Sequence, residues 1–240
     1  MGYDCKISVI SSIFRSDSFI ASFFADITRQ SIFSKLELIL ISPDLSDYER
    51  SVISFYQSEY QNIHLTMVDP DPGLYGCWNV GVEKSTAPYI TNANLDDRRH
   101  PYSLERHLVE LESSPNVDLV YAPCLITTKA NESTESNSAR QLYPCYEFDG
   151  VKGLLRHNSP HCAPMWRRSI HDKYGMFDAS YLSAGDHEMW LRAASQGSVF
   201  KMIPEALCLY YFNPQGLSTD PEKSAKKMKE EKEVREKHKQ

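Results

Sequence analysis

Two patterns of apolar spacing alternate along the first half of the chain. Short runs of consecutive apolar residues are separated by longer stretches in which apolar residues recur every three or four positions. The first pattern predicts buried strands and the second predicts amphipathic helices. We expect strands at residues 6–12, 36–42, 62–69, 88–95 and 117–126, and helices at residues 16–30, 46–60, 74–85 and 103–114.

This alternation predicts the fold class. Strands that alternate with helices of this length form parallel sheets with helices on both faces. We therefore expect an α/β protein with a mostly parallel, doubly wound sheet. The first helix should begin at an N-cap, Ser16, and the fourth at Ser103. The buried face of the first helix should consist of Phe19, Ile20, Phe23, Phe24 and Ile27.

The regular alternation ends near residue 127. Residues 127–141 are polar and predict a mobile loop, whereas residues 186–197 predict a helix that ends at Gly197. Two β-like runs follow, at residues 199–203 and 206–212.

The domain organisation follows from these patterns. We expect one domain made of a nucleotide-binding half, residues 1–126, and an acceptor-binding half, residues 127–219. Residues 220–240 form a charged tail with almost no large apolar residues. A segment of that composition has no apolar face to bury, so we expect a solvated or frayed helix.

Composition excludes several classes of protein. The net charge of −6 argues against broad nucleic-acid binding, which requires a basic surface. No apolar run approaches the roughly 20 residues that span a bilayer. The N-terminal stretch MGYDCK lacks the apolar core of a signal peptide. These features predict a protein of the cytoplasm, or one bound peripherally at the inner face of a membrane. They do not predict the oligomeric state.

The cysteines contain no CxxC pair and are widely separated in the sequence. This spacing is typical of reduced thiols in a cytosolic protein, and it predicts neither a zinc site nor a disulfide framework. The six are Cys5, Cys77, Cys124, Cys145, Cys162 and Cys208.

Polar side chains stand where three of the predicted strands end. Ser11 and Ser12 end the first strand, Asp44 follows the second, and Asp96 and Asp97 follow the fourth. Ligands of open parallel sheets bind at such ends. Hydroxyl and carboxylate groups there suit a nucleoside, and a carboxylate pair beside a diphosphate requires a divalent cation, Mg²⁺ or Mn²⁺. The sequence has neither a P-loop nor a GxGxxG fingerprint.

Five segments in order resemble the family-two glycosyltransferases of the GT-A fold. They are ISVISSIFR, LELILIS, WNVGVEKSTAPYI, NLDD and GDHEMWLR, and the similarity extends from about residue 6 to about residue 215. The resemblance implies an inverting transferase that uses Mn²⁺ or Mg²⁺ and a nucleoside-diphosphate sugar, with UDP as the expected nucleotide. The acceptor would be a glycan or another hydroxyl compound.

The resemblance also implies roles for individual residues. Asp186 would be the general base, and Asp97 with Asp96 would hold the metal. The donor nucleotide would contact Ser11, Ser12, Arg15, Asp44, Asn79 and Asp96. The acceptor would contact Trp166, His161 and Glu188.

The chain departs from the family pattern at four places. A gapless register aligns Pro43, and not Asp44, with the aspartate that contacts the base in relatives. Gly185 replaces a common Glu, and Trp78 replaces a common Arg. Asn213 stands where some relatives carry a metal-binding His.

Simpler interpretations of the same residues remain open. Asp186 could serve only as a helix N-cap, and Asp96 and Asp97 could pair with Arg98 and Arg99 in a solvated loop. At the level of function, a metal-dependent nucleotidyltransferase or phosphohydrolase would also use paired aspartates. A non-catalytic sugar-nucleotide-binding module would keep the fold and lose the base.

Overall fold

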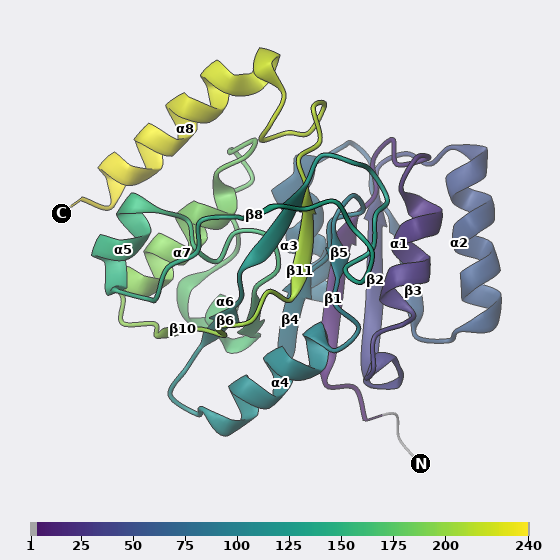
Figure 1. Ribbon diagram of the computed structural model, residues 1–240, viewed down its shortest axis with the longest axis horizontal. Coiled ribbons are helices and arrows are strands. Elements are labelled where there is room, and N and C mark those ends of the chain that lie inside the picture. The colour runs from purple at the N-terminus through teal and green to yellow at the C-terminus, as the bar shows by residue number, and fades with distance from the viewer. Residues whose placement is uncertain (1–3, 240) are drawn as a thin grey trace.

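Two sheets with helices packed around them make up the protein (Figure 1). The computed structural model describes residues 4–239, so the first three residues of the MGYDCK stretch and the last residue of the tail lie outside it. The strands are β1 Ile7–Ser12, β2 Leu36–Ser42, β3 Ile63–Met67, β4 Tyr89–Asn92, β5 Arg98–Arg99, β6 Leu119–Tyr121, β7 Cys124–Thr127, β8 Gln141–Leu142, β9 Met165–Arg167, β10 Phe200–Met202 and β11 Cys208–Tyr211. The α-helices are α1 Ile20–Ile27, α2 Asp47–Glu59, α3 Gly73–Lys84, α4 Ser103–Ser113, α5 Gly150–Arg156, α6 Ser169–Tyr174, α7 Gly185–Ser195 and α8 Ser224–Lys237.

The larger sheet has seven strands in the order β10-β6-β9-β4-β1-β2-β3. All neighbours in it are parallel except β9, which runs antiparallel to β4 and β6. The chain first builds outward from β1 to β3 and then returns to add β4 on the other side of β1. The order therefore reverses beside β1, and the carboxyl ends of β1 and β4 flank the point where ligands bind in sheets of this kind.

The smaller sheet has the order β5-β11-β7-β8 and combines strands from early and late parts of the chain. The larger sheet does the same, because β9 and β10 join strands of the first half. The two halves expected from the sequence therefore share both sheets in one α/β domain.

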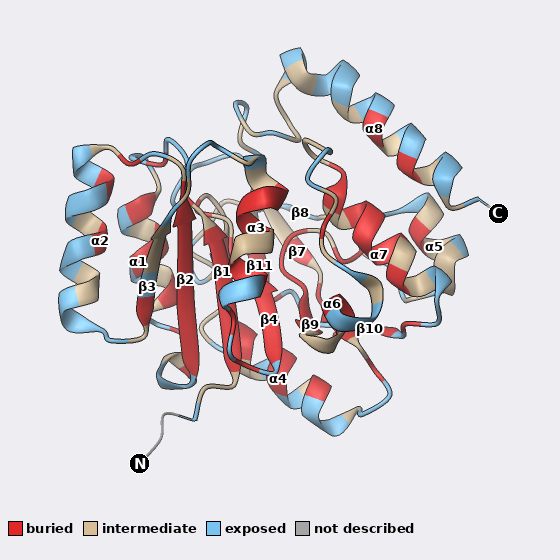
Figure 2. Cartoon of the chain, turned by 180° about the vertical axis from the view of Figure 1, so that it is seen from behind, coloured by how far each residue is buried: buried red, intermediate tan, exposed pale blue. Residues whose placement is uncertain are grey.

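The strand β1 is buried along almost its whole length (Figure 2). Its apolar side chains belong to two cores. Ile7 and Val9 pack with buried residues of α1, α2 and α4, whereas Ile10 packs with buried residues of α3, α6 and α7. This alternation is the period-two pattern of a strand buried on both sides. The prediction of a doubly wound sheet is confirmed.

Most predicted elements are confirmed, with three corrections at their ends. The first helix begins at Ile20 after an N-cap at Phe19. Ser16 does not act as the N-cap, because its hydroxyl exchanges hydrogen bonds with the main chain of Phe14. Ser103 is likewise inside its helix, after an N-cap at Tyr102. Residues 117–126 form no single strand: β6 and β7 belong to different sheets, with Pro123 between them.

The charged tail differs most from its prediction. Residues 224–237 form α8, which packs beside α7 and buries Glu230 and Val234 (Figures 1 and 2). Val234 is fully buried among residues of the second core. The expectation of a helix with no face to bury is wrong. Val234 packs into the core, and Glu230, one helical turn earlier, is buried as well.

Among residues 4–239, no helix combines the length and the apolar composition that crossing a bilayer requires.

Candidate active site

A cavity of about 820 Å³ opens at the carboxyl ends of β1 and β4. Both predicted halves of the chain contribute to its walls. The predicted site residues on its lining are Ser12, Arg15, Asp96, Asp97, His161 and Asp186.

Two segments hold the carboxylate pair in place, namely the end of β11 and the loop that carries the pair. Asp97 accepts a hydrogen bond from the main-chain N–H of Tyr211 at 3.1 Å and one from the Asn94 amide at 3.0 Å. Asp96 accepts one from the Asn213 amide at 3.1 Å. A segment more than 110 residues away in the sequence thus fixes both carboxylates.

Burial and the adjacent charge of Asp96 raise the pKa of Asp97 to about 7. Arg98 donates to the main-chain oxygens of Leu95 and Asp97 and to the side chain of Asn131. Within residues 4–239, neither Arg98 nor Arg99 forms an ion pair with either aspartate. The alternative of a solvated loop of Asp–Arg pairs is wrong, because both arginines are buried and directed elsewhere.

The pair has the chemistry of a divalent-cation site. Two carboxylates with repelling charges offer only oxygen ligands, which Mg²⁺ and Mn²⁺ prefer. A bound cation would offset both the burial and the repulsion from Asp96 that raise the pKa of Asp97. Asn213 directs its amide nitrogen at Asp96, so it orients that carboxylate and does not itself present an oxygen.

Asp186 enters the same cavity from the first turn of α7. The Tyr75 hydroxyl donates to one of its oxygens at 3.1 Å, and the Asn158 amide donates to the other at 2.9 Å. The N-cap position is Ala184, so the alternative that Asp186 is an N-cap is wrong.

Gly185 explains one departure from the family pattern. A Cβ atom at this position would lie 2.6 Å from the ring of Tyr75, which is closer than atoms pack. The same tyrosine donates to Asp186. A glutamate at position 185 would therefore displace the side chain that orients Asp186.

The other residues expected to contact the nucleotide lie in different surroundings. Ser12 and Arg15 line the cavity. The Ser11 hydroxyl donates to the Ala93 carbonyl, and the Asn79 amide exchanges hydrogen bonds with the main chain of Phe177. Asp44 is exposed and is not on the cavity lining.

Pro43 lines the cavity in place of Asp44, which agrees with the gapless register.

Only one of the three residues expected to contact the acceptor lines the cavity. His161 stacks on Tyr143 with ring centroids 4.1 Å apart, and burial lowers its pKa to about 4. Trp166 is fully buried and donates to His171, and Glu188 is fully buried beside Arg192 and Lys237. The expectation that Trp166 and Glu188 contact an acceptor is wrong for this cavity.

Several residues of the site carried no usable signal in the sequence. Asn158 lies in an irregular segment, and Tyr75 occupies an ordinary core position of a helix. Glu230 is one of many charges in the tail, yet it accepts main-chain hydrogen bonds from Leu182 and Ser183 at 2.8 Å each. Leu182 and Ser183 lie just before the first turn of α7, which carries Asp186. Glu230 of α8 therefore stabilises the segment that leads into α7.

Solved glycosyltransferases share this fold. A structure of TarS from S. aureus in complex with UDP-GlcNAc matches with a TM-score of 0.72 and 14% identity, covering 92% of this chain and 69% of that one. The mannosyltransferase PcManGT from Pyrobaculum calidifontis, in complex with GDP-Man and Mn²⁺, matches with a TM-score of 0.65 and 16% identity, covering 89% of this chain and 59% of that one. The chain therefore has the GT-A fold expected from its sequence.

Sequence comparisons reach the same family. The uncharacterized glycosyltransferase YwdF of Bacillus subtilis (strain 168) is 24% identical over 236 residues, which are 97% of this chain and 84% of that protein. EpsJ of the same organism, also an uncharacterized glycosyltransferase, is 23% identical over 91% of this chain and 64% of its own length. The family model for glycosyl transferase family 2 matches residues 8–175. On this evidence the chain is a member of glycosyl transferase family 2.

Proposed function

We propose that this transferase moves a sugar from a UDP-linked donor to a hydroxyl group of a glycan or similar acceptor, with inversion at the anomeric carbon. The observation that carries the proposal is that Asp97, with Asp96, and Asp186 line one cavity from opposite parts of the sequence. One acidic group is a half-buried pair and the other is a single carboxylate held by neutral donors.

The donor nucleotide is assigned to the end of the cavity that carries Ser12, Arg15 and the aspartate pair. Asp97 and Asp96 would hold Mg²⁺ or Mn²⁺, which when bound stabilises negative charge on the departing nucleoside diphosphate. Arg15 adds a positive charge on the same lining. The relatives of known structure support a nucleotide-sugar donor, since one is in complex with UDP-GlcNAc and another with GDP-Man and Mn²⁺.

Asp186 is assigned the role of general base. An acceptor hydroxyl must lose a proton as it attacks the anomeric carbon, and a positioned carboxylate takes that proton. Tyr75 and Asn158 orient the carboxylate through neutral hydrogen bonds. A single base with no enzyme nucleophile gives one displacement, and one displacement inverts the anomeric centre.

The acceptor is assigned to the part of the cavity near Asp186, where Asn158, His161 and Tyr143 form the wall. Aromatic faces and neutral hydrogen-bond donors suit a sugar ring. The low pKa of His161 keeps its ring neutral at physiological pH. The acceptor would therefore meet the neutral rings of Tyr143 and His161, with the charged groups Asp186 and Lys227 nearby.

The experiment is incubation with a panel of sugar nucleotides in the presence of Mn²⁺, followed by measurement of free nucleoside diphosphate. We expect slow release of UDP from one UDP-sugar, and loss of both release and nucleotide binding in Asp97→Ala or with a chelator. Asp44→Ala is the matched control, because this carboxylate is exposed and lies outside the cavity. Release of UMP or pyrophosphate would instead support a phosphohydrolase or nucleotidyltransferase.

A further inference from the structure

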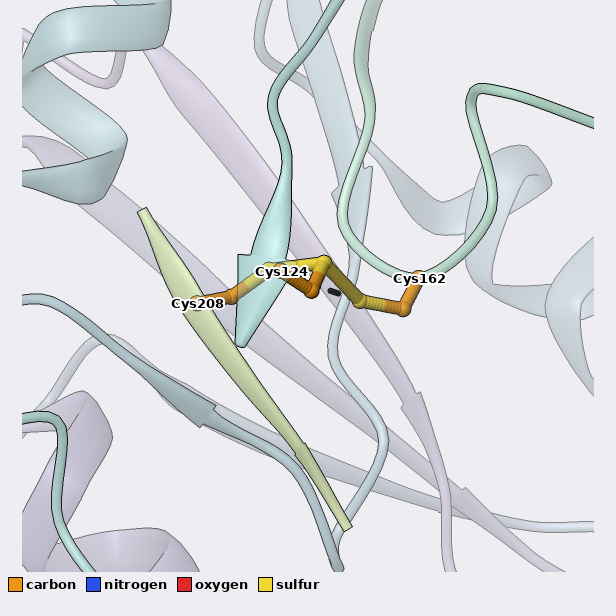
Figure 3. A group of neighbouring side chains, drawn as sticks. All are labelled: Cys124, Cys162 and Cys208. Atoms are coloured by element: carbon orange, nitrogen blue, oxygen red, sulfur yellow. Dashed lines mark hydrogen bonds between the residues drawn. A yellow bond between two sulfur atoms is a disulfide. The ribbon is translucent and has the colours of Figure 1, made fainter. Parts of the chain in front are cut away.

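Three cysteines that are far apart in the sequence meet in one buried cluster (Figure 3). Cys124 is on β7, Cys208 is on β11, and Cys162 is in the segment before β9. Their sulfur atoms all lie within 4.8 Å of one another, and none of the residues is more than 5% exposed. The cysteine spacing predicted separate reduced thiols, and it could not predict this cluster, because the pairing of β7 with β11 brings Cys124 and Cys208 together.

A disulfide accounts for only part of this cluster. The Cys124 sulfur is in close contact with both other sulfurs, but one sulfur atom can form only one disulfide. The Cα atoms of Cys124 and Cys162 are 7.5 Å apart, and Cα atoms more than about 7 Å apart are not bridged without backbone movement. A Cys124–Cys208 bond, with Cα atoms 4.7 Å apart, would not include the third sulfur of the cluster, that of Cys162.

We propose that Cys124, Cys162 and Cys208 are the three protein ligands of one Zn²⁺ ion. Thiolates are soft ligands that bind Zn²⁺ tightly, and a metal ion uses all three sulfurs at once. Two thiolates on one ion also tolerate the wider Cα spacing of Cys124 and Cys162, because the ion lies between them. The three ligands leave the fourth tetrahedral position to water, which can enter because Cys162 lines the cavity.

A buried cation offsets the charge of such a site. Three thiolates around Zn²⁺ carry one net negative charge. Arg99 is the cation that we assign to offset it, and its charge also acts on Asp26 and Asp97. Arg99 is directly opposite Cys208 in the antiparallel β5–β11 pair, so both side chains are on one face of the small sheet. Arg99 is buried, and its Nη1 atom has no hydrogen-bond partner among the described residues.

Two hydrogen bonds also link Arg99 to the main chain of Cys162 through Asn92. The Nη2 atom of Arg99 donates to the Asn92 carbonyl, and the Asn92 amide donates to the Cys162 carbonyl at 3.5 Å. The ion would therefore connect β7, β11 and the cavity wall at Cys162, the three segments where the two sheets meet. This role is separate from that of the carboxylate pair, which has only oxygen ligands.

The test is metal content measured by plasma mass spectrometry on protein that has been reduced, exposed to Zn²⁺ and dialysed. We expect one Zn²⁺ per chain in the wild type. Cys77→Ser is the matched control, since Cys77 is also a buried thiol but lies outside the cluster, and it should keep the ion. Cys162→Ser and Cys208→Ser should lose it. Asp97→Ala should keep it, which separates this site from the proposed function.

Two results would overturn the zinc site. One is wild-type protein that stays metal-free after reduction and exposure to Zn²⁺. The other is bound Zn²⁺ that persists in both Cys162→Ser and Cys208→Ser. Thermal melting of each variant shows whether it is folded. Peptide mapping without reductant identifies a Cys124–Cys208 disulfide, and finding that bond in metal-free protein supports the disulfide in place of the ion.

Discussion

The two acidic groups of the cavity are built in different ways. Asp97 and Asp96 are adjacent carboxylates after a central strand, and burial together with mutual repulsion raises the pKa of Asp97 to about 7. Asp186 is a single carboxylate on a helix, held by a hydroxyl and an amide that carry no charge. A cation between two repelling carboxylates stabilises their charged form, whereas a single carboxylate oriented by neutral donors suits the role of a general base.

Their supports also differ. The carboxylate pair depends on Asn213 and the main chain of Tyr211, at the end of β11. The turn before Asp186 depends on Glu230 of α8. Each site is therefore sensitive to a different late segment of the chain, and substitutions can separate the two.

The largest expected effect is that of Asp186→Asn on turnover. The amide has nearly the same shape but cannot take the proton, and removal of a general base costs roughly 10²–10⁴ in rate. Nucleotide affinity should not change, because Asp186 is not part of the carboxylate pair. Steady-state UDP release and calorimetry with UDP measure the two quantities. Undiminished turnover in a folded variant would exclude Asp186 as the base.

The second expected effect is that of Asn213→Ala on the Mn²⁺ requirement. Loss of the hydrogen bond to Asp96 frees that carboxylate to rotate, and removal of a residue that orients a metal ligand costs roughly 10–100-fold in metal affinity or activity. Titration of Mn²⁺ in the activity assay measures the change. Gln215→Ala is the control, because Gln215 contacts Asn213 only through its main-chain N–H. An unchanged Mn²⁺ requirement would remove Asn213 from the site.

The pH dependence of metal binding should come from Asp97. Its pKa is raised from 3.8 to about 7, so between these values the folded protein holds a proton that the unfolded chain has lost. Metal-free stability therefore falls as pH rises from about 4 to 7, and the cation must displace the proton below pH 7.

Mn²⁺ affinity should consequently weaken about tenfold per pH unit below pH 7, since one pKa unit corresponds to a factor of ten. Calorimetry between pH 5 and 8 checks this slope. In Asp97→Asn the slope should vanish, and a wild-type affinity that does not vary over this range would contradict the assignment.

The smallest effect concerns the attachment of α8. Glu230→Ala leaves the main-chain N–H groups of Leu182 and Ser183 without their partner, at a cost of about 1–3 kcal/mol. For a chain of this size each kcal/mol lowers Tm by about 2–4 °C. Glu233→Ala on the exposed side of α8 should leave Tm nearly unchanged, because its ion pair with Lys229 is at the surface. The same Tm in both variants would show that Glu230 of α8 does not stabilise the turn before α7.

The sequence alone determined the central sheet and the end of it, at the carboxyl ends of β1 and β4, where the cavity lies. The strands β1, β2 and β4 are largely apolar and buried on both faces, and β1, β2 and β3 are each followed by a helix. Ser12, Asp96 and Asp97 could be placed at the cavity because they end strands whose direction the pattern already fixed. The late aspartate could be placed because its motif identified it.

Only the tertiary structure decided how late segments complete the site. Asn213 reaches Asp96, Asn158 reaches Asp186, and Glu230 reaches the turn before α7 across separations of 117, 28 and about 48 residues. No local period encodes such contacts, because each is a single polar side chain meeting its partner after packing. The three cysteines converge for the same reason: strand pairing between β7 and β11 brings two of them together, and neither strand's own sequence specifies its neighbour.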